Sequence, residues 1–375
     1  MTVQGAVAPG FEGVREEFAA VVAAEPGLGA QLAVYRHGEQ VVDLWAGLAE
    51  DALLALYSSG KGAAHLVVAL LVQDGVLDLD RAVASYWPEF AAGGKERVTL
   101  RDLLAHRAGL VGVTGGFDAE ELADDRLLAG RLAGERPAFE DGYGYHALTI
   151  GALTGEVVRR VTGRTLRQVY EERVRAPHGL DFHLGLPADL EPRYAPVQPP
   201  ASPSPTPTPE GLTALAFNTP LDLVAFANTR RVRELGQASA GSVGSARGLA
   251  RMYAAAIGPV DGLPPLLGPD VLAEFTRPHS TGVDLVTGER DHFLLGFEAQ
   301  GVRYQGLGAD AFGHSGAVGA QAFADPRSGT AYSYTRRRFA VGGGGGAAEN
   351  HRLVAAVLRA PAAPNSVGRQ RRHVQ

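Results

Sequence analysis

The sequence predicts an α+β fold in which an antiparallel sheet, flanked by helices, is assembled from both ends of the chain around an inserted all-helical lobe. β-rich runs occur near the N-terminus, helical periodicity dominates the middle, and β-rich runs return near the C-terminus. A chain of 375 residues with 45% hydrophobic residues can bury a sizeable core. We expect a discontinuous sheet lobe from residues 1–80 and 240–375 and a mainly helical lobe from residues 81–239.

The N-terminal region carries the first helix and the first strands. Apolar residues recur at helical spacing across residues 11–24, with charged residues between them. Two short β-rich runs follow at residues 31–35 and 41–45, and Gly38 lies in the polar stretch between them. This pattern predicts an amphipathic helix followed by a β-hairpin with Gly38 in its turn.

The strongest helical pattern in the chain runs from Lys61 to Gln73, and Asp74-Gly75 ends it. The middle of the chain is predominantly α-helical. Further helices are predicted at residues 100–104, 119–133, 148–161, 166–174 and 221–227.

A proline-rich segment and a polar tail interrupt this pattern. Eight prolines, interleaved with Ser and Thr, lie between residues 192 and 209, and we expect an extended surface loop there. Residues 361–375 are polar and basic, so we expect a frayed tail. The C-terminal elements between these segments are predicted as a helix at 246–257, strands at 321–324 and 330–335, and a last helix after the glycine run 342–346.

Charge and composition exclude several kinds of partner and site. The formal net charge is −6, with acidic and basic residues interspersed, so neither nucleic acid nor an anionic membrane is an expected partner. The chain has no cysteine, which excludes disulfides, thiolate metal sites and cysteine nucleophiles. Residues 1–10 lack the basic start and apolar stretch of a secretory signal, and we expect a soluble, cytoplasmic protein.

Several common catalytic motifs do not fit this sequence. No G-x-S-x-G nucleophile elbow occurs, and H-E-x-x-H is absent. Gly60-Lys61 resembles the end of a phosphate-binding loop, but Ala55 stands where that loop needs glycine and Gly62 where it needs Ser or Thr. We therefore reject a nucleotide-binding interpretation.

One S-x-x-K motif lies at the start of the strongest helix. Residues three apart on a helix share a face, so the Lys61 amine can reach the Ser58 hydroxyl, whereas Ser59 points elsewhere. A lysine with its ordinary pKa of ~10.4 is a poor base at neutral pH, so burial or a nearby charge must lower that pKa. The alternative is that Ser58 only caps the helix and Lys61 is solvated, since a lone S-x-x-K motif is common by chance.

Two later segments strengthen the catalytic interpretation. Tyr145 lies in a loop before a predicted helix, where its hydroxyl can project into a cleft. His314 lies in a run of small residues, 312–319, that would let the backbone approach a ligand closely. Taken separately, a tyrosine such as Tyr145 is more often a packing residue, and a histidine such as His314 is more often a satisfied strand residue.

Taken together and in order, the three segments resemble the serine β-lactamase and penicillin-recognising superfamily, above all family VIII carboxylesterases and class C β-lactamases. That family carries S-x-x-K, then Y-x-N or a tyrosine variant, then K-T-G or H-x-G on a strand. The matching segments here are Ser58-Ser59-Gly60-Lys61, Tyr145-His146-Ala147 and His314-Ser315-Gly316. The resemblance extends over most of the chain, from about Leu32 to Tyr334.

The resemblance implies a site and a reaction. The active site would lie between the sheet lobe and the helical lobe, and a small-molecule ester or acyl compound would be the substrate. Ser58 would attack a carbonyl, Lys61 and Tyr145 would transfer the proton, and no metal or organic cofactor would be needed. The backbone N–H groups of Ser58 and Ala317 would hold the oxyanion, with His314, Ser315 and Gly316 beside the substrate.

Departures from the family pattern bear on the substrate. Ala147 replaces the asparagine of Y-x-N and His314 replaces the lysine of K-T-G, which favours esters over β-lactams. Gly60 and Arg336 are smaller departures, and His106 and His146 are expected to be structural. Three alternatives stay open: a β-lactamase or D-peptidase, an acyltransferase or peptide cyclase in which an amine or alcohol replaces water, and a catalytically silent ligand-binding protein.

Overall fold

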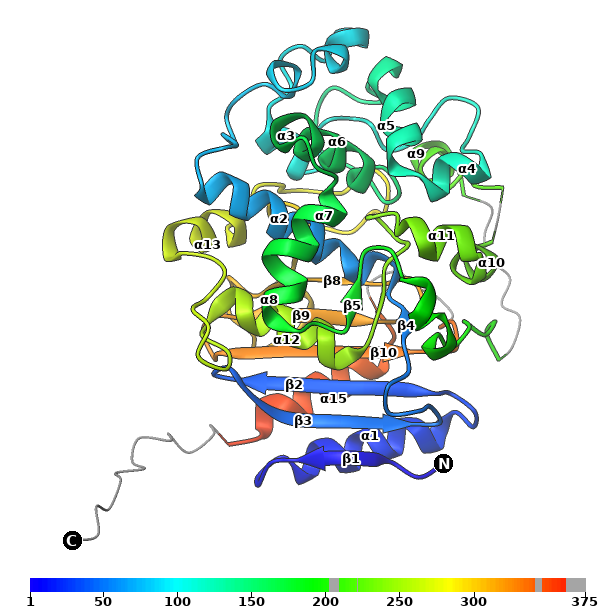
Figure 1. The fold of residues 1–375 in the computed structure, drawn as a ribbon, viewed down its shortest axis with the longest axis vertical. Helices are drawn as coiled ribbons and strands as arrows, with labels where there is room; N and C mark the ends of the chain where they lie inside the picture. Colours follow the sequence, from blue (N-terminus) through cyan, green and yellow to red (C-terminus); the bar gives the residue numbers. More distant parts are fainter. Residues whose placement is uncertain (202–208, 221, 341–345, 362–375) are drawn as a thin grey trace, which may run out of the picture.

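The fold consists of a central sheet with helices on both faces and a large helical region beyond one edge (Figure 1). The computed structural model describes residues 1–201, 209–220, 222–340 and 346–361. Within this part of the chain, no helix combines the length and the apolar character that crossing a membrane requires. Most of the predicted tail, residues 362–375, and most of the glycine run lie outside the described residues.

The central sheet has seven strands in the order β1-β3-β2-β10-β9-β8-β7, and every neighbouring pair is antiparallel. Strands from the two ends of the chain meet in its middle, because β2 pairs with β10. The predicted fold class is therefore confirmed. The strands are β1 (Gln4–Val7), β2 (Ala30–Arg36), β3 (Glu39–Ala46), β7 (Glu298–Ala299), β8 (Phe312–Ser315), β9 (Gln321–Asp325) and β10 (Thr330–Arg336).

The predicted hairpin joins β2 and β3 through a two-residue turn. His37 and Gly38 both have positive φ angles, 51° and 82°, which is typical of the type I′ turn that matches the twist of the flanking strands. Gly38 takes this conformation without a steric penalty. The turn sets Arg36 opposite Glu39 and brings the buried faces of both strands onto the core.

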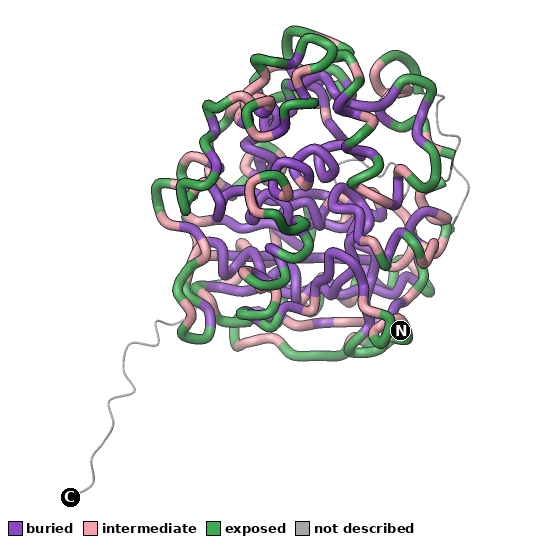
Figure 2. Tube along the Cα trace, turned by 45° about the horizontal axis from the view of Figure 1, so that its top comes forward, coloured by how far each residue is buried: buried purple, intermediate pink, exposed green. Residues whose placement is uncertain are grey.

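Helices cover the two faces of the sheet with two separate cores. Helices α1 (Glu12–Ala24) and α15 (Glu349–Arg359) pack on one face, and α12 (Ala246–Ile257) packs on the other against β2, β9 and β10. The second core continues into α2 (Lys61–Gln73) and the helical region, where Figure 2 shows buried stretches of chain in the interior. This places α2 between the sheet and the helical region.

The helical region contains short helices rather than a few long ones. Its members are α3 (Leu100–Leu104), α4 (Ala119–Ala123), α5 (Asp125–Gly134), α6 (Ile150–Thr162), α7 (Leu166–Tyr170), α8 (Ala176–His178), α9 (Gly211–Ala216), α10 (Leu223–Asn228) and α11 (Arg230–Leu235). A small second sheet, β4 (Leu54–Ala55), β6 (Val243–Gly244) and β5 (Phe182–His183), lies close to the start of α2. The lobe boundaries at residues 81 and 239 stay a prediction.

Some predicted elements are corrected by the structure. The helix expected over residues 119–133 is two helices, because the backbone of Asp124 is extended and its carboxylate caps α5 by accepting from the N–H of Arg126. The segment expected to be an extended loop from residue 192 begins inside a short 3₁₀ helix, and Gln198 pairs with the backbone of Arg337 and Phe339. Residues 202–208 of that segment lie outside the described part. Strand β1 was missed because its four residues show no apolar alternation.

Candidate active site

Ser58 lies in a 3₁₀ turn, Tyr57–Gly60, that leads directly into α2. Every residue from 52 to 71 is described, and all of them are buried except Ser58, which is partly exposed. The apolar side chains around it explain this burial, since α2 is enclosed by the core on nearly its whole circumference. The turn therefore presents one hydroxyl to the exterior from an otherwise enclosed segment.

Ser59 has a different role from Ser58. Its hydroxyl is fully buried and donates to the carbonyl of Leu56 at 2.6 Å. This bond closes the turn that carries Ser58 and leaves no free hydroxyl at position 59. The arrangement agrees with the prediction that, of the two serines, Ser58 faces Lys61.

The backbone around Ser58 is held in an uncommon conformation. Tyr57 has a φ of 49°, which non-glycine residues rarely adopt, and its hydroxyl donates to Leu223 O at 2.7 Å. Gly60 is required because a Cβ at this position would lie 1.9 Å from the Ser242 hydroxyl. The departure of Gly60 from the family pattern thus reflects close packing beside the turn.

Lys61 is completely buried and its amine makes three contacts. Nζ lies 2.7 Å from Ser58 Oγ, 2.8 Å from Ala147 O and 2.7 Å from Ser239 O. Burial lowers the pKa of Lys61 well below its ordinary value, against the opposing charges of Glu298 and Asp125. A catalytic lysine needs a lowered pKa, and desolvation lowers the pKa of Lys61.

The two carbonyls that Lys61 contacts are held in place by backbone segments that lie far apart in the sequence. The Ser239 hydroxyl accepts from the N–H of Gly151, and Gln237 Nε2 donates to Leu148 O at 2.9 Å. These bonds tie the loop after α11 to the start of α6, so the carbonyls of Ala147 and Ser239 face the same amine. Ser239 was not found from the sequence, because a backbone acceptor leaves no residue signature.

Tyr145 lies beside Lys61, as predicted. Nζ of Lys61 is 5.0 Å from the centre of the Tyr145 ring, and that ring stacks on Phe293 with centroids 5.3 Å apart. The hydroxyl is buried and makes no hydrogen bond of ordinary geometry among the described residues, although it lies close enough to the Ser58 hydroxyl to interact with it. Burial raises the pKa of Tyr145 well above its ordinary value, although the Ser58 hydroxyl opposes that rise.

The end of β8 lies against the turn that holds Ser58. A Cβ on Gly316 would lie 2.4 Å from Leu56 O, so glycine lets this strand approach the turn closely. Its N–H donates to Ala320 O at 2.8 Å and is not free for a substrate. Ala317 is the one partly exposed residue in the stretch 311–325. Two partly exposed positions, Ser58 and Ala317, thus come from two buried segments that touch.

His314 and Ser315 are both buried, and their polar atoms face Glu298 rather than solvent. Ser315 Oγ donates to Glu298 Oε1 at 2.6 Å, and the Ser315 N–H donates to Glu298 Oε2 at 3.0 Å. Nδ1 of His314 lies 3.2 Å from Glu298 Oε1. The Ser315 hydroxyl is committed to this carboxylate, and Glu298 is a site residue that the sequence reasoning missed.

His106 and His146 form part of the frame around Tyr145. The N–H of His146 donates to His106 Nδ1 at 3.1 Å, and His146 Nε2 accepts from the N–H of Leu110 at 3.0 Å. Nδ1 of His146 contacts Gly144 O at 2.7 Å. Both rings are fully buried, and these bonds agree with the structural roles expected for them.

A pH dependence of stability follows from His146. Burial lowers the pKa of His146 from 6.5 to about 4, so between these values the unfolded chain binds a proton that the folded protein does not. The contribution of a neutral His146 to the free energy of unfolding is therefore fully present above pH 6.5, and it is lost as the pH drops towards 4. The loss by pH 4.5 is about 2–3 kcal/mol for this group.

Urea unfolding at pH 7 and pH 4.5 measures this loss. In His146→Gln, which cannot titrate, the difference between the two pH values should shrink by about 2 kcal/mol. The matched control is His351→Gln at an exposed histidine, which should leave the difference as in the wild type. An unchanged pH difference in His146→Gln would contradict the assignment of a neutral buried ring.

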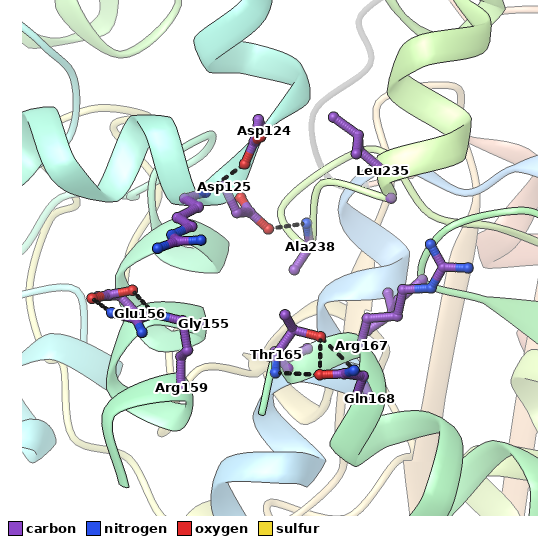
Figure 3. A pocket seen from close by; sticks show the side chains of 14 residues that line it. Asp124, Asp125, Gly155, Glu156, Arg159, Thr165, Arg167, Gln168, Leu235 and Ala238 are labelled. Carbon is purple, nitrogen blue, oxygen red and sulfur yellow. Dashed lines mark hydrogen bonds and ion pairs between the residues drawn. The ribbon is translucent and has the colours of Figure 1, made fainter. Parts of the chain in front are cut away.

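A separate cavity of about 430 Å³ lies between α5, α6, α7 and the loop after α11 (Figure 3). Its lining does not include Ser58, Lys61 or Tyr145, so it is distinct from the site described above. Asp125 at its edge accepts from the N–H of Ala238 at 2.7 Å, and burial raises the pKa of Asp125 to about 7. In the described ranges, no group of three or more His, Asp or Glu side chains has the geometry to hold a metal ion.

Three comparisons with known proteins all match this chain to beta-lactamase or esterase relatives. The family model described as Beta-lactamase matches residues 15–357. The chain is 31% identical to "Esterase/beta-lactamase LipL" of Mycobacterium tuberculosis, over 90% of this chain and 83% of LipL. Among solved structures, EstA from Arthrobacter nitroguajacolicus Rue61a is 40% identical with a TM-score of 0.90, covering 96% of this chain and 98% of EstA. A family VIII carboxylesterase is 34% identical with a TM-score of 0.89, covering 96% of this chain and all of that protein's chain.

Proposed function

The chain belongs to the beta-lactamase family and is a serine hydrolase of the carboxylesterase kind, and on that premise we propose that Ser58 is its nucleophile, Lys61 its general base and Tyr145 its general acid. One observation carries this proposal. In a buried stretch of twenty residues, the one partly exposed side chain is a serine whose Oγ lies 2.7 Å from a buried lysine amine. A nucleophile within hydrogen-bond distance of its base is the geometry that acyl transfer needs.

The contacts of Lys61 fit a base that starts neutral. A neutral amine has two N–H donors and one lone pair, and here two backbone carbonyls accept while the Ser58 hydroxyl can donate. Once the amine has taken the serine proton, the same three oxygens can accept from the ammonium. Both protonation states are therefore satisfied without movement, which lowers the reorganisation needed during proton transfer.

The reaction then proceeds through an acyl-enzyme. Ser58 Oγ bonds to the acyl carbon as its proton passes to Lys61 Nζ, and the backbone N–H groups of Ser58 and Ala317 hold the oxyanion. Tyr145, protonated because of its raised pKa, gives its proton to the departing alkoxide. The Lys61 ammonium returns the serine proton to Tyr145, so protons balance. Water then attacks the acyl carbon while its proton passes to Lys61 Nζ, the bond to Ser58 Oγ breaks, and Lys61 returns the proton to Oγ as the acid leaves.

Intact-mass spectrometry after mixing with p-nitrophenyl esters of increasing acyl length tests this scheme. A transient mass increase from one acyl group in place of a proton should appear as p-nitrophenol is released, and it should decay as water frees the carboxylic acid. Hydrolysis with no acylated species under rapid quench, at several acyl lengths and pH values, would contradict the covalent route. Replacement of water by an amine or alcohol as the acyl acceptor stays a prediction, as does a cytoplasmic location.

β-Lactam hydrolysis is the second candidate, and the name of LipL favours it. The site offers little to a β-lactam carboxylate, because burial lowers the pKa of His314 to about 4 and keeps that ring neutral at pH 7. Ala147 also has no side-chain amide, and its carbonyl is occupied by Lys61. The site therefore fits neutral esters better than anionic β-lactams.

We expect kcat/KM for p-nitrophenyl butyrate to exceed that for nitrocefin by at least about 100-fold, roughly 2.7 kcal/mol of transition-state discrimination. Both substrates are measured with one enzyme preparation, and Ser58→Ala supplies the background rate for each. Equal kcat/KM values on the two substrates would reject ester preference and make β-lactam hydrolysis the better description.

A further inference from the structure

Asp125 is a carboxylate beside the separate cavity that the proposed reaction does not use. It is the first residue of α5, but the residue before it, Asp124, caps that helix by accepting from the N–H of Arg126. The Asp125 side chain is therefore free for another contact, and its Oδ2 accepts from the N–H of Ala238 at 2.7 Å (Figure 3). This bond joins α5 to the loop after α11, which lies 113 residues further along the chain.

The turn formed by residues 237–241 carries a carbonyl that Lys61 contacts. The N–H of Gly241 donates to Gln237 O at 2.7 Å and closes the turn. In the middle of the turn, the carbonyl of Ser239 accepts from Lys61 Nζ at 2.7 Å. Any contact that fixes this turn therefore also fixes the direction of an acceptor for the buried amine.

Three side-chain hydrogen bonds join this turn to its neighbours. Two of them are between neutral groups, and both connect the turn to the start of α6, as described above. The third is the bond from Ala238 to Asp125, and it is the one of the three that has a carboxylate acceptor. A hydrogen bond to an ionised acceptor is about twice as strong as one between neutral groups. The contact with Asp125 is thus the strongest of these three restraints when the carboxylate is ionised.

The position of Asp125 costs the folded protein stability. Its Oδ1 is buried and has no hydrogen-bond partner among the described residues. Burial raises the pKa of Asp125 from 3.8 to about 7, against the opposing effects of the Ala238 N–H and the Lys61 charge. The folded protein therefore holds this proton more tightly than the unfolded chain, and its stability falls as the pH rises from about 4 to 7. Residues that cost stability in this way concentrate at functional sites.

We propose that Asp125 is a positioning residue for the general base. Its carboxylate holds the turn 237–241, so that the carbonyl of Ser239 stays aligned with Lys61 Nζ. That carbonyl then accepts from the ammonium that forms when the Ser58 proton arrives. The inference rests on the proposed function, in which Lys61 is the base. The proton transfer itself is unchanged, because the Oγ–H bond breaks, the Nζ–H bond forms, and Asp125 keeps its protonation state.

Charged groups around Asp125 come from several elements. Asp124 precedes it on the chain, and Lys61 acts on it from α2. The cavity lining adds Arg126, Glu156, Arg159 and Arg167, of which Arg159 pairs with Glu156 at 2.6 Å. The Asp125 charge also raises the pKa of Lys61, against the effect of burial. A test must therefore separate the charge of Asp125 from its hydrogen bond to the turn.

Two substitutions make this separation. Asp125→Asn removes the charge but keeps an oxygen that can accept from the Ala238 N–H, whereas Asp125→Ala removes both. Asp125→Ala should lower kcat for p-nitrophenyl butyrate by about 10–100-fold with little change in KM, because a displacement of about 1 Å at a catalytic group is enough for such a loss. Asp125→Asn should keep most of the wild-type kcat. Equal losses in the two variants would show that Asp125 acts by its charge and would overturn its positioning role.

The cavity allows the missing carboxylate to be supplied from solution. Asp125→Ala leaves space beside the Ala238 N–H that opens into the cavity of about 430 Å³, and formate is small enough to enter it. Sodium formate, compared with sodium chloride at equal ionic strength, should raise kcat of Asp125→Ala and leave the wild type unchanged. Asp124→Ala is the matched control, because Asp124 lines the same cavity but caps α5. This control should lose stability, keep its kcat and show no response to formate. An equal response in both variants would overturn the proposal.

Amide hydrogen exchange measures the positioning without any turnover. The N–H of Ala238 should be protected in the wild type, should exchange about tenfold faster or more in Asp125→Ala, and should regain protection when formate is added. Unchanged exchange in Asp125→Ala would overturn the proposal, and so would formate that restores protection without restoring kcat. Activity retained in Ser58→Ala would instead reject the proposed function, while the exchange result on the turn would still stand.

Discussion

Ser58→Ala is expected to lower kcat/KM for p-nitrophenyl butyrate by a factor of about 10⁴ or more, down to the rate of the uncatalysed background. The physical reason is that the acyl group then has no oxygen to bond to, while Lys61 and the oxyanion-binding N–H groups stay in place. The variant should fold normally, because Ser58 is partly exposed and its removal opens no cavity. Initial rates, together with the thermal unfolding midpoint, measure both effects.

Ser59→Ala is the matched control for this variant. Its hydroxyl donates to Leu56 O in the buried turn, so its loss should cost about 1 kcal/mol of stability, because Leu56 O then keeps only the backbone N–H of residue 59 as a donor. Activity should stay within about tenfold of the wild type, because Ser59 makes no contact with Lys61. The opposite pattern, with Ser59→Ala inactive and Ser58→Ala active, would show that Ser59 is the nucleophile and contradict the assignment of Ser58.

Lys61→Ala and Tyr145→Phe are each expected to lower kcat by about 10³. Lys61→Ala should also reduce stability by about 1–3 kcal/mol, because the carbonyls of Ala147 and Ser239 lose their buried donor. Tyr145→Phe should leave stability nearly unchanged, since its hydroxyl makes no hydrogen bond of ordinary geometry among the described residues. Rates and urea unfolding of the same preparations separate catalysis from folding.

The double variant shows whether Lys61 and Tyr145 act on one proton. Tyr145 gives its proton to the leaving group and regains one from Lys61, which holds the serine proton, so losing either residue interrupts the same route. The double variant should therefore be within about tenfold of the slower single variant. If the two losses multiplied fully, or if Tyr145→Phe retained wild-type turnover, Tyr145 would be a packed aromatic and not the acid.

Much of the fold could be read from local periodicity. The helices that begin at Lys61 and Ala246 and the hairpin around Gly38 have strong apolar patterns and clear turn residues, and the structure places them where they were predicted. The family fold was accessible because three short motifs recur in a fixed order. The break between α4 and α5 at Asp124 could not be predicted, because the apolar spacing continues across it while the Asp124 side chain caps a new helix.

The parts of the site that sequence reasoning missed share a physical cause. Lys61 contacts the backbone carbonyl of Ser239, which any residue type would supply. Glu298 lies on a two-residue edge strand, which is too short to show a sequence pattern. The lowered pKa of Lys61 and the raised pKa of Tyr145 both come from burial, which depends on the packing of distant segments. Spacing could place Ser58 over Lys61, but it could not show which group is the base.

The identity of the nucleophile is the claim on which the rest depends, and labelling with a fluorophosphonate followed by peptide mapping tests it most directly. The reagent phosphonylates an activated serine, and the account predicts one adduct, on Ser58, that is lost in Ser58→Ala and slowed in Lys61→Ala. An adduct on Ser59 or Ser315 in the folded wild-type protein, with Ser58 unlabelled, would contradict it.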